Sequence, residues 1–220
     1  MRIAHTLIMA AGRGSRMMPL TNEIPKAMAK FRDTTLIANS IEKLKNNSQN
    51  IHITEGADLA KHVIEQDVSS IFNTEGKGNA WWIFNTLIKN LDEPILVLTC
   101  DNVIELDMDR IYKDYISLNS PACLVVPVQP VEGLEGDYIF HDQNRVTELN
   151  RHKPSTMYCS GIQLLNPAKV NQYCDPAEDF YSVWSQLISK HQFYCSNVYP
   201  NKWFTVDTMA QLEFINNNEH

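Results

Sequence analysis

The sequence predicts an α/β protein with a doubly wound, mostly parallel central sheet, and three observations support this fold class. Residues 3–9 have the pattern of a buried strand, and 95–99 form a continuous apolar run typical of a central parallel strand. Each run stops abruptly in a polar loop. Helical patterns separate the strand-like segments throughout the first half of the chain. Strands that alternate with helices give a sheet covered on both sides, a three-layer α/β/α sandwich.

The first half of the chain supplies the alternating elements. Its clearest helix spans 35–46, where Ile37, Ile41 and Leu44 recur at spacings of four and three and therefore share one apolar face. The run at 95–99 is the best candidate for a central strand. The other elements predicted in this half are a strand at 51–54, a helix around 59–65, a short strand ending near 72, and a helix over 79–90.

The second half is richer in strands. We expect strands at 122–128, 157–165 and 193–198, a hairpin of 138–140 and 146–149 around Gln143-Asn144, and helices at 180–188 and 208–215. The chain shows no linker, repeat or low-complexity segment. A chain of 220 residues, 44% of them hydrophobic, is long enough for one domain with a substantial core. We therefore predict a single domain over 1–220 that closes with a strand and helix at 203–216.

Composition excludes several classes of protein. The formal net charge of −7 and the pI near 5.5 argue against a protein that grips long nucleic acid. Five scattered cysteines form no CxxC pair and no zinc spacing, as expected for buried thiols in a reducing compartment. The N-terminus does not have the pattern of a signal peptide, and no run has the length of a membrane span. We expect a cytoplasmic protein with neither nucleic acid nor membrane as partner.

A glycine-rich loop follows the first strand and is a candidate phosphate site. Glycines at 12 and 14 would let backbone N–H groups approach phosphate oxygens, and arginines at 13 and 16 would add planar donors. The spacing alone fits an ordinary surface turn equally well. The dinucleotide fingerprint is absent because Met17 stands where it needs a third glycine, and no P-loop pattern is present.

The longer string around this loop closely resembles a family signature. Residues 7–21, LIMAAGRGSRMMPLT, with Pro25-Lys26-Ala27-Met28 after them, are similar to the first motif of the sugar-1-phosphate nucleotidyltransferases, whose relatives include phosphocholine cytidylyltransferases. The resemblance implies a Rossmann-like nucleotide-diphospho-sugar transferase fold. It also implies a nucleotide-binding part at about 1–119 and a small β-rich acceptor-binding part at about 120–200.

The resemblance assigns roles to residues of the first motif. Arg16 would neutralise charge at the α-phosphate, and Lys26 would bridge the α-phosphate and the attacking phosphate. Such an acceptor is already an oxyanion, so it needs alignment and charge cancellation rather than a general base. The nucleotide-binding residues implied are Ala10, Ala11, Gly12, Arg13, Gly14, Ser15, Asn73 and Gly78.

Two acidic residues are candidate magnesium ligands. Asp101 follows the best central strand, the edge where ligands bind in open α/β sheets, and its surroundings resemble the family's second motif. Asp207 lies in a string, WFTVDT, that looks like the family's late motif, in which a second residue completes the metal site. The alternatives are local: Asp101 could cap the following turn, and Asp207 could cap the helix that begins near Thr208.

The acceptor side matches the family less well. His152-Lys153-Pro154 stands where sugar-specific members show Glu-Lys-Pro, and a histidine is a poor substitute for a carboxylate that holds sugar hydroxyls. Either Glu148 or Asn150 compensates, or the acceptor is not an ordinary sugar phosphate. A tryptophan pair at 81–82 could form an aromatic cage for a cationic head group, although core packing suits Trp82 better. The acceptor-binding residues implied are Asn79, Trp81, Asn102, Glu148, His152, Lys153 and Gly161.

Together these features predict a Mg²⁺-dependent nucleotidyltransferase. It would join a nucleoside triphosphate, with CTP or UTP favoured, to a small phosphorylated acceptor and release pyrophosphate. Its product would be an activated sugar or a cytidylyl metabolite, as used for cell-surface polysaccharide, and the protein would act as a monomer or homodimer. A glycosyltransferase is the alternative enzyme class, because Asp107-Met108-Asp109 has DxD spacing, although acids at this place also suit the start of a helix. A non-catalytic nucleotide-binding domain is the third possibility.

Overall fold

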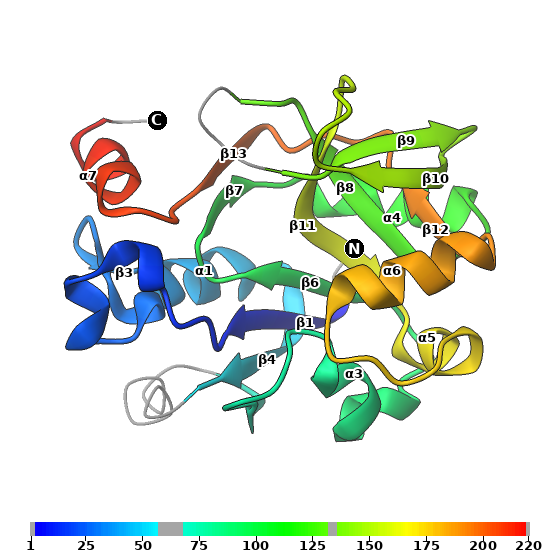
Figure 1. Ribbon diagram of the computed structural model, residues 1–220. Coiled ribbons are helices and arrows are strands. Elements are labelled where there is room, and N and C mark those ends of the chain that lie inside the picture. Colours follow the sequence, from blue (N-terminus) through cyan, green and yellow to red (C-terminus); the bar gives the residue numbers. More distant parts are fainter. Residues whose placement is uncertain (1–2, 57–67, 132–135, 219–220) are drawn as a thin grey trace.

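The computed structural model describes residues 3–56, 68–131 and 136–218. Its centre is one large sheet with helices on both faces, the predicted three-layer α/β fold (Figure 1). The strands lie in the order β5 (Ser70–Asn73), β4 (Ser48–Glu55), β1 (Ile3–Ala10), β6 (Ile95–Thr99), β11 (Tyr158–Leu165), β8 (Cys123–Val128), β12 (Phe193–Cys195), β10 (Arg145–Asn150) and β9 (Tyr138–Asp142).

The parallel part of the sheet sets the position of the site. Strands β5, β4, β1 and β6 all run parallel, and Met9 of β1 lies opposite Thr99 of β6. The glycine-rich loop that leaves β1 and Asp101 that follows β6 therefore emerge side by side at the carboxyl edge of the sheet. This is the edge at which ligands bind in open α/β sheets.

Beyond β6 the sheet becomes mixed. Strand β11 is antiparallel to both β6 and β8, whereas β8 and β12 are parallel. Strands β9 and β10 form the predicted hairpin, and both residues of its turn have positive φ, 48° at Gln143 and 67° at Asn144. Asn tolerates this left-handed conformation better than most residues, which explains the turn.

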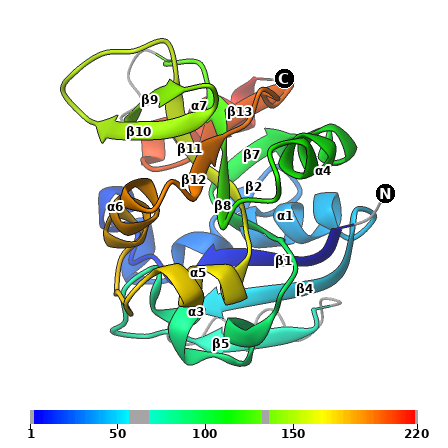
Figure 2. The same cartoon turned by 90° about the vertical axis from the view of Figure 1, so that its right-hand side faces the viewer.

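Helices cover both faces of the sheet, and a separate apolar core lies between each face and its helices (Figure 2). The helices α1 (Leu36–Leu44) and α4 (Met108–Ser117) pack on one face through residues such as Ile41 and Ile111. The other face is covered by α3 (Trp81–Asn85), α5 (Pro167–Tyr173) and α6 (Phe180–Ser189). No helix within the described ranges is long and apolar enough to cross a membrane.

Two small ribbons and a last helix complete the fold. The ribbon of β7 (Asn102–Glu105) and β13 (Lys202–Thr205) brings the end of the chain back to the residues that follow β6. Helix α7 (Met209–Asn217) follows it, and β2 (Lys30–Phe31) pairs with β3 (Thr34–Thr35). Single 3-10 turns occupy Ser15–Met17, Leu20–Asn22, Lys26–Met28 and Leu87–Asn90.

Most predicted elements are present, with three differences. The helix predicted over 79–90 is two short helices, because the backbone at Thr86 is extended and its hydroxyl caps the second one. The strand predicted at 193–198 ends at Cys195. Strand β7, its pairing with β13, and α5 were not predicted, whereas β13 matches the closing strand expected from 203. The helix expected around 59–65 lies outside the described residues. The five cysteines are free thiols, and all but the half-buried Cys159 are buried.

Candidate functional site

The loop after β1 has a conformation that only glycine fits at one point. Gly14 has φ 61°, and a Cβ there would lie 2.8 Å from the Lys26 Cβ and 2.9 Å from the Thr21 Cγ2. The Thr21 hydroxyl donates a hydrogen bond to the Gly14 carbonyl at 2.9 Å. By contrast, a Cβ on Gly12 would meet nothing within 4 Å, because the space above that residue is open. The loop thus packs against Lys26 on one side and faces a cavity on the other.

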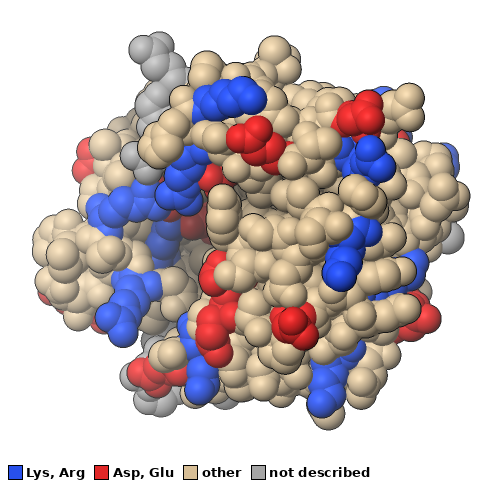
Figure 3. Space-filling view, turned by 45° about the vertical axis from the view of Figure 1, so that its right-hand side comes forward, with Lys and Arg blue, Asp and Glu red and all other residues tan. Residues whose placement is uncertain are grey.

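A cavity of about 390 Å³ opens at this edge of the sheet. In the space-filling view, Lys and Arg side chains gather around a hollow in the surface (Figure 3). The cavity brings together eleven of the predicted residues from five separate parts of the chain: Ala10, Ala11, Gly12, Gly14, Ser15, Arg16, Lys26, Gly78, Asn79, Asp101 and Asp207.

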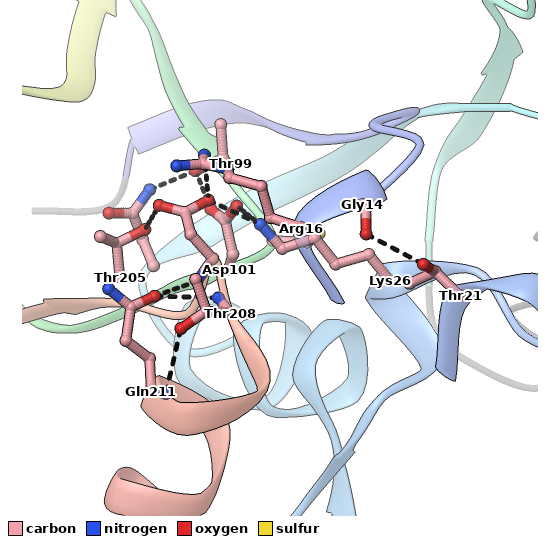
Figure 4. Close-up of polar contacts among 12 residues, drawn as sticks. Gly14, Arg16, Thr21, Lys26, Thr99, Asp101, Thr205, Thr208 and Gln211 are labelled. Carbon is pink, nitrogen blue, oxygen red and sulfur yellow. Dashed lines mark hydrogen bonds and ion pairs between the residues drawn. The ribbon is translucent and has the colours of Figure 1, made fainter. Parts of the chain in front are cut away.

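Lys26 is the centre of a four-residue ion-pair network. Its Nζ lies 2.5 Å from Asp101 Oδ2 and 2.9 Å from Asp207 Oδ1. The Nη2 of Arg16 lies 3.0 Å from the same oxygen of Asp207. Figure 4 marks the contacts of this network as dashed lines around the labelled Asp101. Two positive and two negative charges thus sum to zero at the charged end of the cavity.

The fold explains how two acids more than a hundred residues apart meet. Asp101 follows β6, where its carboxylate accepts a short hydrogen bond from the Thr99 hydroxyl. Asp207 follows β13, whose partner β7 begins immediately after Asp101. The Val206 N–H donates to the Asp101 carbonyl at 3.1 Å, which holds the two backbones together. Pairing of β7 with β13 is therefore what carries the second acid into the site.

Asp207 is not the cap of the last helix, which was the alternative interpretation of the sequence. The Thr208 hydroxyl accepts from the Gln211 N–H, and the Gln211 side chain reaches back to the Thr208 N–H, so these two residues form a complete capping box. The Asp207 carboxylate is left to bind Lys26 and Arg16, and it also accepts from the Thr205 hydroxyl at 3.3 Å. The DxD string is likewise structural, because Asp107 caps α4.

The network keeps Lys26 charged. Burial alone lowers the pKa of Lys26, but the neighbouring carboxylates of Asp101 and Asp207 outweigh it and raise the pKa above 10.5. Its side chain is only 10% exposed. A buried ammonium group of this kind persists because it is paired with carboxylates. Lys26 therefore remains protonated near neutral pH, within a network whose charges sum to zero.

The donor set of the site fits a magnesium ion. The Asp101 and Asp207 carboxylates contact one ammonium group, so a single cation can be shared by both. Among the described residues, no group of three or more His, Cys, Asp and Glu side chains could hold a metal ion. Magnesium commonly takes one or two carboxylates and obtains its other oxygens from phosphates and water. The two acids suit that mode of binding.

Apart from Asn79, the residues predicted for the acceptor lie outside the cavity lining. On β10 and the loop after it, Glu148 accepts from the Asn150 amide at 2.8 Å and lies 3.6 Å from the Lys153 Nζ. His152 is exposed beside them. Glu148 thus pairs with Asn150 and Lys153 at the surface, whereas most of the predicted nucleotide residues line the cavity.

The remaining predicted residues have local partners. Asn102 is buried. Its side-chain oxygen accepts a hydrogen bond from the Trp203 indole N–H, and its side-chain NH2 group donates one to the Thr99 hydroxyl. The Lys77 Nζ stands 5.5 Å from the centre of the Trp81 ring. Trp82 is 1% exposed, so the two tryptophans do not form an open cage. Arg13, Asn73 and Gly161 also lie outside the cavity lining.

Sequence reasoning missed part of the lining. Thr54 from β4, Thr74 and Lys77 from the loop after β5, and Thr99 from β6 all border the cavity. The register could have identified Thr54, because it lies opposite Met9 in the parallel pair of β1 and β4. The carboxyl ends of neighbouring parallel strands meet at one edge, so each strand end was a candidate.

Comparison with known proteins identifies relatives at the level of sequence. The family model described as "Nucleotidyl transferase" matches residues 5–169. Curated relatives that are 24% identical are named Mannose-1-phosphate guanyltransferase. The protein from Pichia angusta aligns over 91% of this chain and 60% of its own length, and that from Debaryomyces hansenii over 75% and 50%. This chain therefore spans about half to 60% of the length of these relatives.

Solved structures share the fold over nearly the whole chain. A putative glucose-1-phosphate thymidylyltransferase from Bacillus anthracis has a TM-score of 0.79 and 17% identity, covering 97% of this chain and 94% of its own. The inositol-1-phosphate CTP transferase from T. maritima has a TM-score of 0.79 and 14% identity, with coverages of 98% and 96%. The CTP:phosphocholine cytidylyltransferase from Streptococcus pneumoniae has a TM-score of 0.74 and 20% identity, with both coverages 99%.

Proposed function

Because this chain belongs to the nucleotidyl transferase family, we propose that it transfers the nucleotidyl group of a nucleoside triphosphate to a small phosphorylated acceptor. One observation carries the proposal: Lys26 and Arg16 meet Asp101 and Asp207 in a cavity beside the glycine-rich loop. A polyanionic substrate needs cations that are already in place, and the exposed Arg16 and the buried Lys26 are in place here. The nucleotide would occupy the part formed by about 1–119, and the acceptor the part formed by about 120–200.

The reaction requires alignment and charge cancellation. An oxygen of the acceptor phosphate forms a bond to the α-phosphorus, the bond from that phosphorus to the oxygen bridging to the β-phosphate breaks, and pyrophosphate leaves. A phosphate monoester is already ionised near neutral pH, so no general base is required. Lys26 and Arg16 would exchange their carboxylate partners for phosphate oxygens and reduce the repulsion between the two anions.

Asp101 and Asp207 are the residues that would hold Mg²⁺. The bound ion supplies positive charge against the triphosphate. The Thr99 and Thr205 hydroxyls, each bonded to one of these carboxylates, would keep the acids oriented toward the cavity.

We further propose a pyrimidine triphosphate, CTP or UTP, as the donor. The support is the Ala10-Ala11-Gly12 form of the first motif and the names of the structural neighbours, two of which are CTP transferases and one a thymidylyltransferase. The sequence relatives are named guanyltransferases, so a test must include GTP. Candidate acceptors are sugar 1-phosphates, inositol 1-phosphate and phosphocholine.

The test is pyrophosphate release. The purified protein should be incubated with Mg²⁺, each of CTP, UTP, dTTP, GTP and ATP, and each candidate acceptor, with Asp101→Asn as the matched inactive control. Release that requires both an acceptor and Asp101 would support the proposal. Transfer from a nucleotide sugar without pyrophosphate would instead identify a glycosyltransferase. Release with GTP but with no pyrimidine triphosphate would overturn only the choice of base.

A further inference from the structure

One wall of the cavity is a loop, 74–80, that is held at two ends. Thr74, Lys77, Gly78 and Asn79 of this loop border the cavity. At the inner end, the N–H and the hydroxyl of Thr74 both donate to the Glu55 carbonyl, at 2.8 and 3.0 Å. The outer end, at Gly78 to Ala80, has its anchors in a distant part of the chain.

Those anchors come from the segment 178–180 that begins α6. The Gly78 N–H donates to the Glu178 Oε2 at 2.8 Å, and the Ala80 N–H donates to the Glu178 carbonyl at 2.9 Å. In the other direction, the Phe180 N–H donates to the Asn79 Oδ1 at 2.9 Å. We call these three hydrogen bonds the 78–178 clasp. Glu178 supplies two of the three acceptors.

The clasp joins the two halves of the protein at very short range. A Cβ on Gly78 would lie 1.9 Å from the Glu178 carbonyl oxygen, so no other residue fits there without moving the backbone. Helix α6, which begins at Phe180, packs on β10 and β12 of the second half. The Phe180 ring also lies 6.4 Å from the ring of Trp82, which borders the same cavity. The clasp therefore fixes the position of this cavity wall relative to the part proposed to bind the acceptor.

We propose that Glu178 is a positioning residue for the nucleotide. Its carboxylate holds the Gly78 amide and so fixes the wall of the cavity against which the triphosphate's nucleoside binds. Because this amide already has an acceptor, Gly78 contributes shape to the site and not a free N–H. The role rests on the proposed function. It requires an acceptor oxygen at this place and not a negative charge, so glutamine can fulfil it and alanine cannot.

The test compares three variants in nucleotide binding and in turnover. Glu178→Ala should raise both the Kd for a non-hydrolysable analogue of the preferred triphosphate and the KM for that triphosphate roughly 10-fold, the scale of one lost hydrogen bond. Its kcat should stay within about 2-fold, because the groups at the phosphates are untouched. Glu178→Gln should stay within about 2-fold of wild type in every constant.

The matched control is Glu75→Ala. Glu75 is an exposed acid in the same loop, and its carboxylate has no hydrogen-bond or ion-pair partner among the described residues. This variant should bind and turn over as wild type does. It separates the clasp from a general effect of negative charge near the cavity.

Each outcome decides between the two proposals. Unchanged binding in Glu178→Ala, with wild-type protein active, would overturn the positioning role and leave the proposed function intact. A Glu178→Gln variant as impaired as Glu178→Ala, or a kcat that falls with KM unchanged, would also overturn it. Wild-type protein that binds no triphosphate would overturn the proposed function and this role together. Thermal unfolding of each variant checks that any loss of binding is not caused by a loss of stability, as expected for the exposed residue Glu178.

Discussion

One lysine is buried and tightly paired in one half of the molecule, and another is exposed and loosely paired in the other. In the part proposed to bind the nucleotide, which we call the nucleotide half, Lys26 is 10% exposed and contacts two carboxylates within 3 Å. In the part proposed to bind the acceptor, which we call the acceptor half, Lys153 is 60% exposed and lies 3.6 Å from Glu148, with its Nζ 4.3 Å from the centre of the Phe140 ring. The first arrangement is fixed before any ligand arrives, whereas the second is an ordinary surface pair.

This difference matches the chemistry proposed for each half. Every nucleoside triphosphate presents the same phosphates, so a preorganised set of charges suits all of them. Acceptors differ in their non-phosphate part, and an exposed hairpin such as β9–β10 can vary without disturbing the parallel part of the sheet. The following predictions test whether the two halves are as different in energy as they are in geometry.

The largest effect is expected from neutralising Lys26, and the same change at Lys153 serves as its comparison. Lys26→Met should reduce turnover roughly 1,000-fold and lower the free energy of unfolding by about 3 kcal/mol, because Asp101 and Asp207 then face each other without their buried partner. Lys153→Met should cost less than about 1 kcal/mol. Steady-state pyrophosphate release and urea unfolding at pH 7.5 measure both. Near-wild-type turnover in Lys26→Met would remove that residue from the mechanism.

Unfolding can be compared at pH 7.5 because, despite its burial, Lys26 has a pKa that Asp101 and Asp207 raise above 10.5. The stability that the lysine contributes is therefore complete below pH 10.5 and is lost only as the pH rises through the folded-state pKa.

A second comparison uses two glycines with similar backbones. Gly14→Ala should destabilise the protein by at least about 3 kcal/mol, because left-handed strain adds to contacts of 2.8 and 2.9 Å with Lys26 and Thr21. Gly161 has φ 77°, but a Cβ there meets nothing within 4 Å, so Gly161→Ala should cost only about 1–2 kcal/mol of strain. Denaturant midpoints measure both variants. Equal losses would show that the close contacts with Lys26 and Thr21 add nothing to the cost of the substitution at Gly14.

Acid sensitivity should also belong to the nucleotide half. His5 and His52, on β1 and β4, have ring centroids 5.2 Å apart. Burial, and then the charge of His5, lowers the pKa of His52 to about 4. The unfolded chain binds a proton near pH 6.5, so stability falls as the pH drops from 6.5 toward 4, by about 2 kcal/mol. His52→Gln should remove that slope, as read from unfolding free energies at pH 7 and 4.5; an unchanged slope would assign acid sensitivity elsewhere.

The smallest effect is expected at the acceptor hairpin. His152→Ala should change the KM for the acceptor by roughly 3- to 10-fold and leave the KM for the triphosphate within about 2-fold, since this side chain lies outside the nucleotide cavity. The measurement is a pair of saturation curves, one for each substrate. If His152→Ala changed only the KM for the triphosphate, the hairpin would not take part in acceptor binding, which would contradict the account.

The sequence predicted the parallel half of the fold well because its signals are local. Apolar runs gave β1 and β6, and the string around Gly14 and Lys26 gave the loop. Strand β7 and its pairing with β13 could not be predicted, since Asn102–Glu105 is too short and too mixed in polarity to show a period, and the pairing with Lys202–Thr205 spans about a hundred residues. Thr86 broke a helix because capping outweighed an amphipathic pattern.

For the site, sequence motifs predicted that Asp101 and Asp207 belong to one metal site, but not that both carboxylates contact Lys26. That contact depends on the ribbon, which is tertiary information. The Glu178 carboxylate had no signal at all, because nothing in its sequence surroundings distinguishes an acceptor for Gly78 from a solvated acid.

Whether Asp101 and Asp207 act on one cation with the nucleotide is tested most directly by calorimetric titration of a non-hydrolysable triphosphate analogue with and without Mg²⁺. Wild-type protein should bind at least 10-fold more tightly with Mg²⁺, and either Asp101→Asn or Asp207→Asn should abolish that difference. An Asp207→Asn variant that retains the full Mg²⁺ effect would contradict the account.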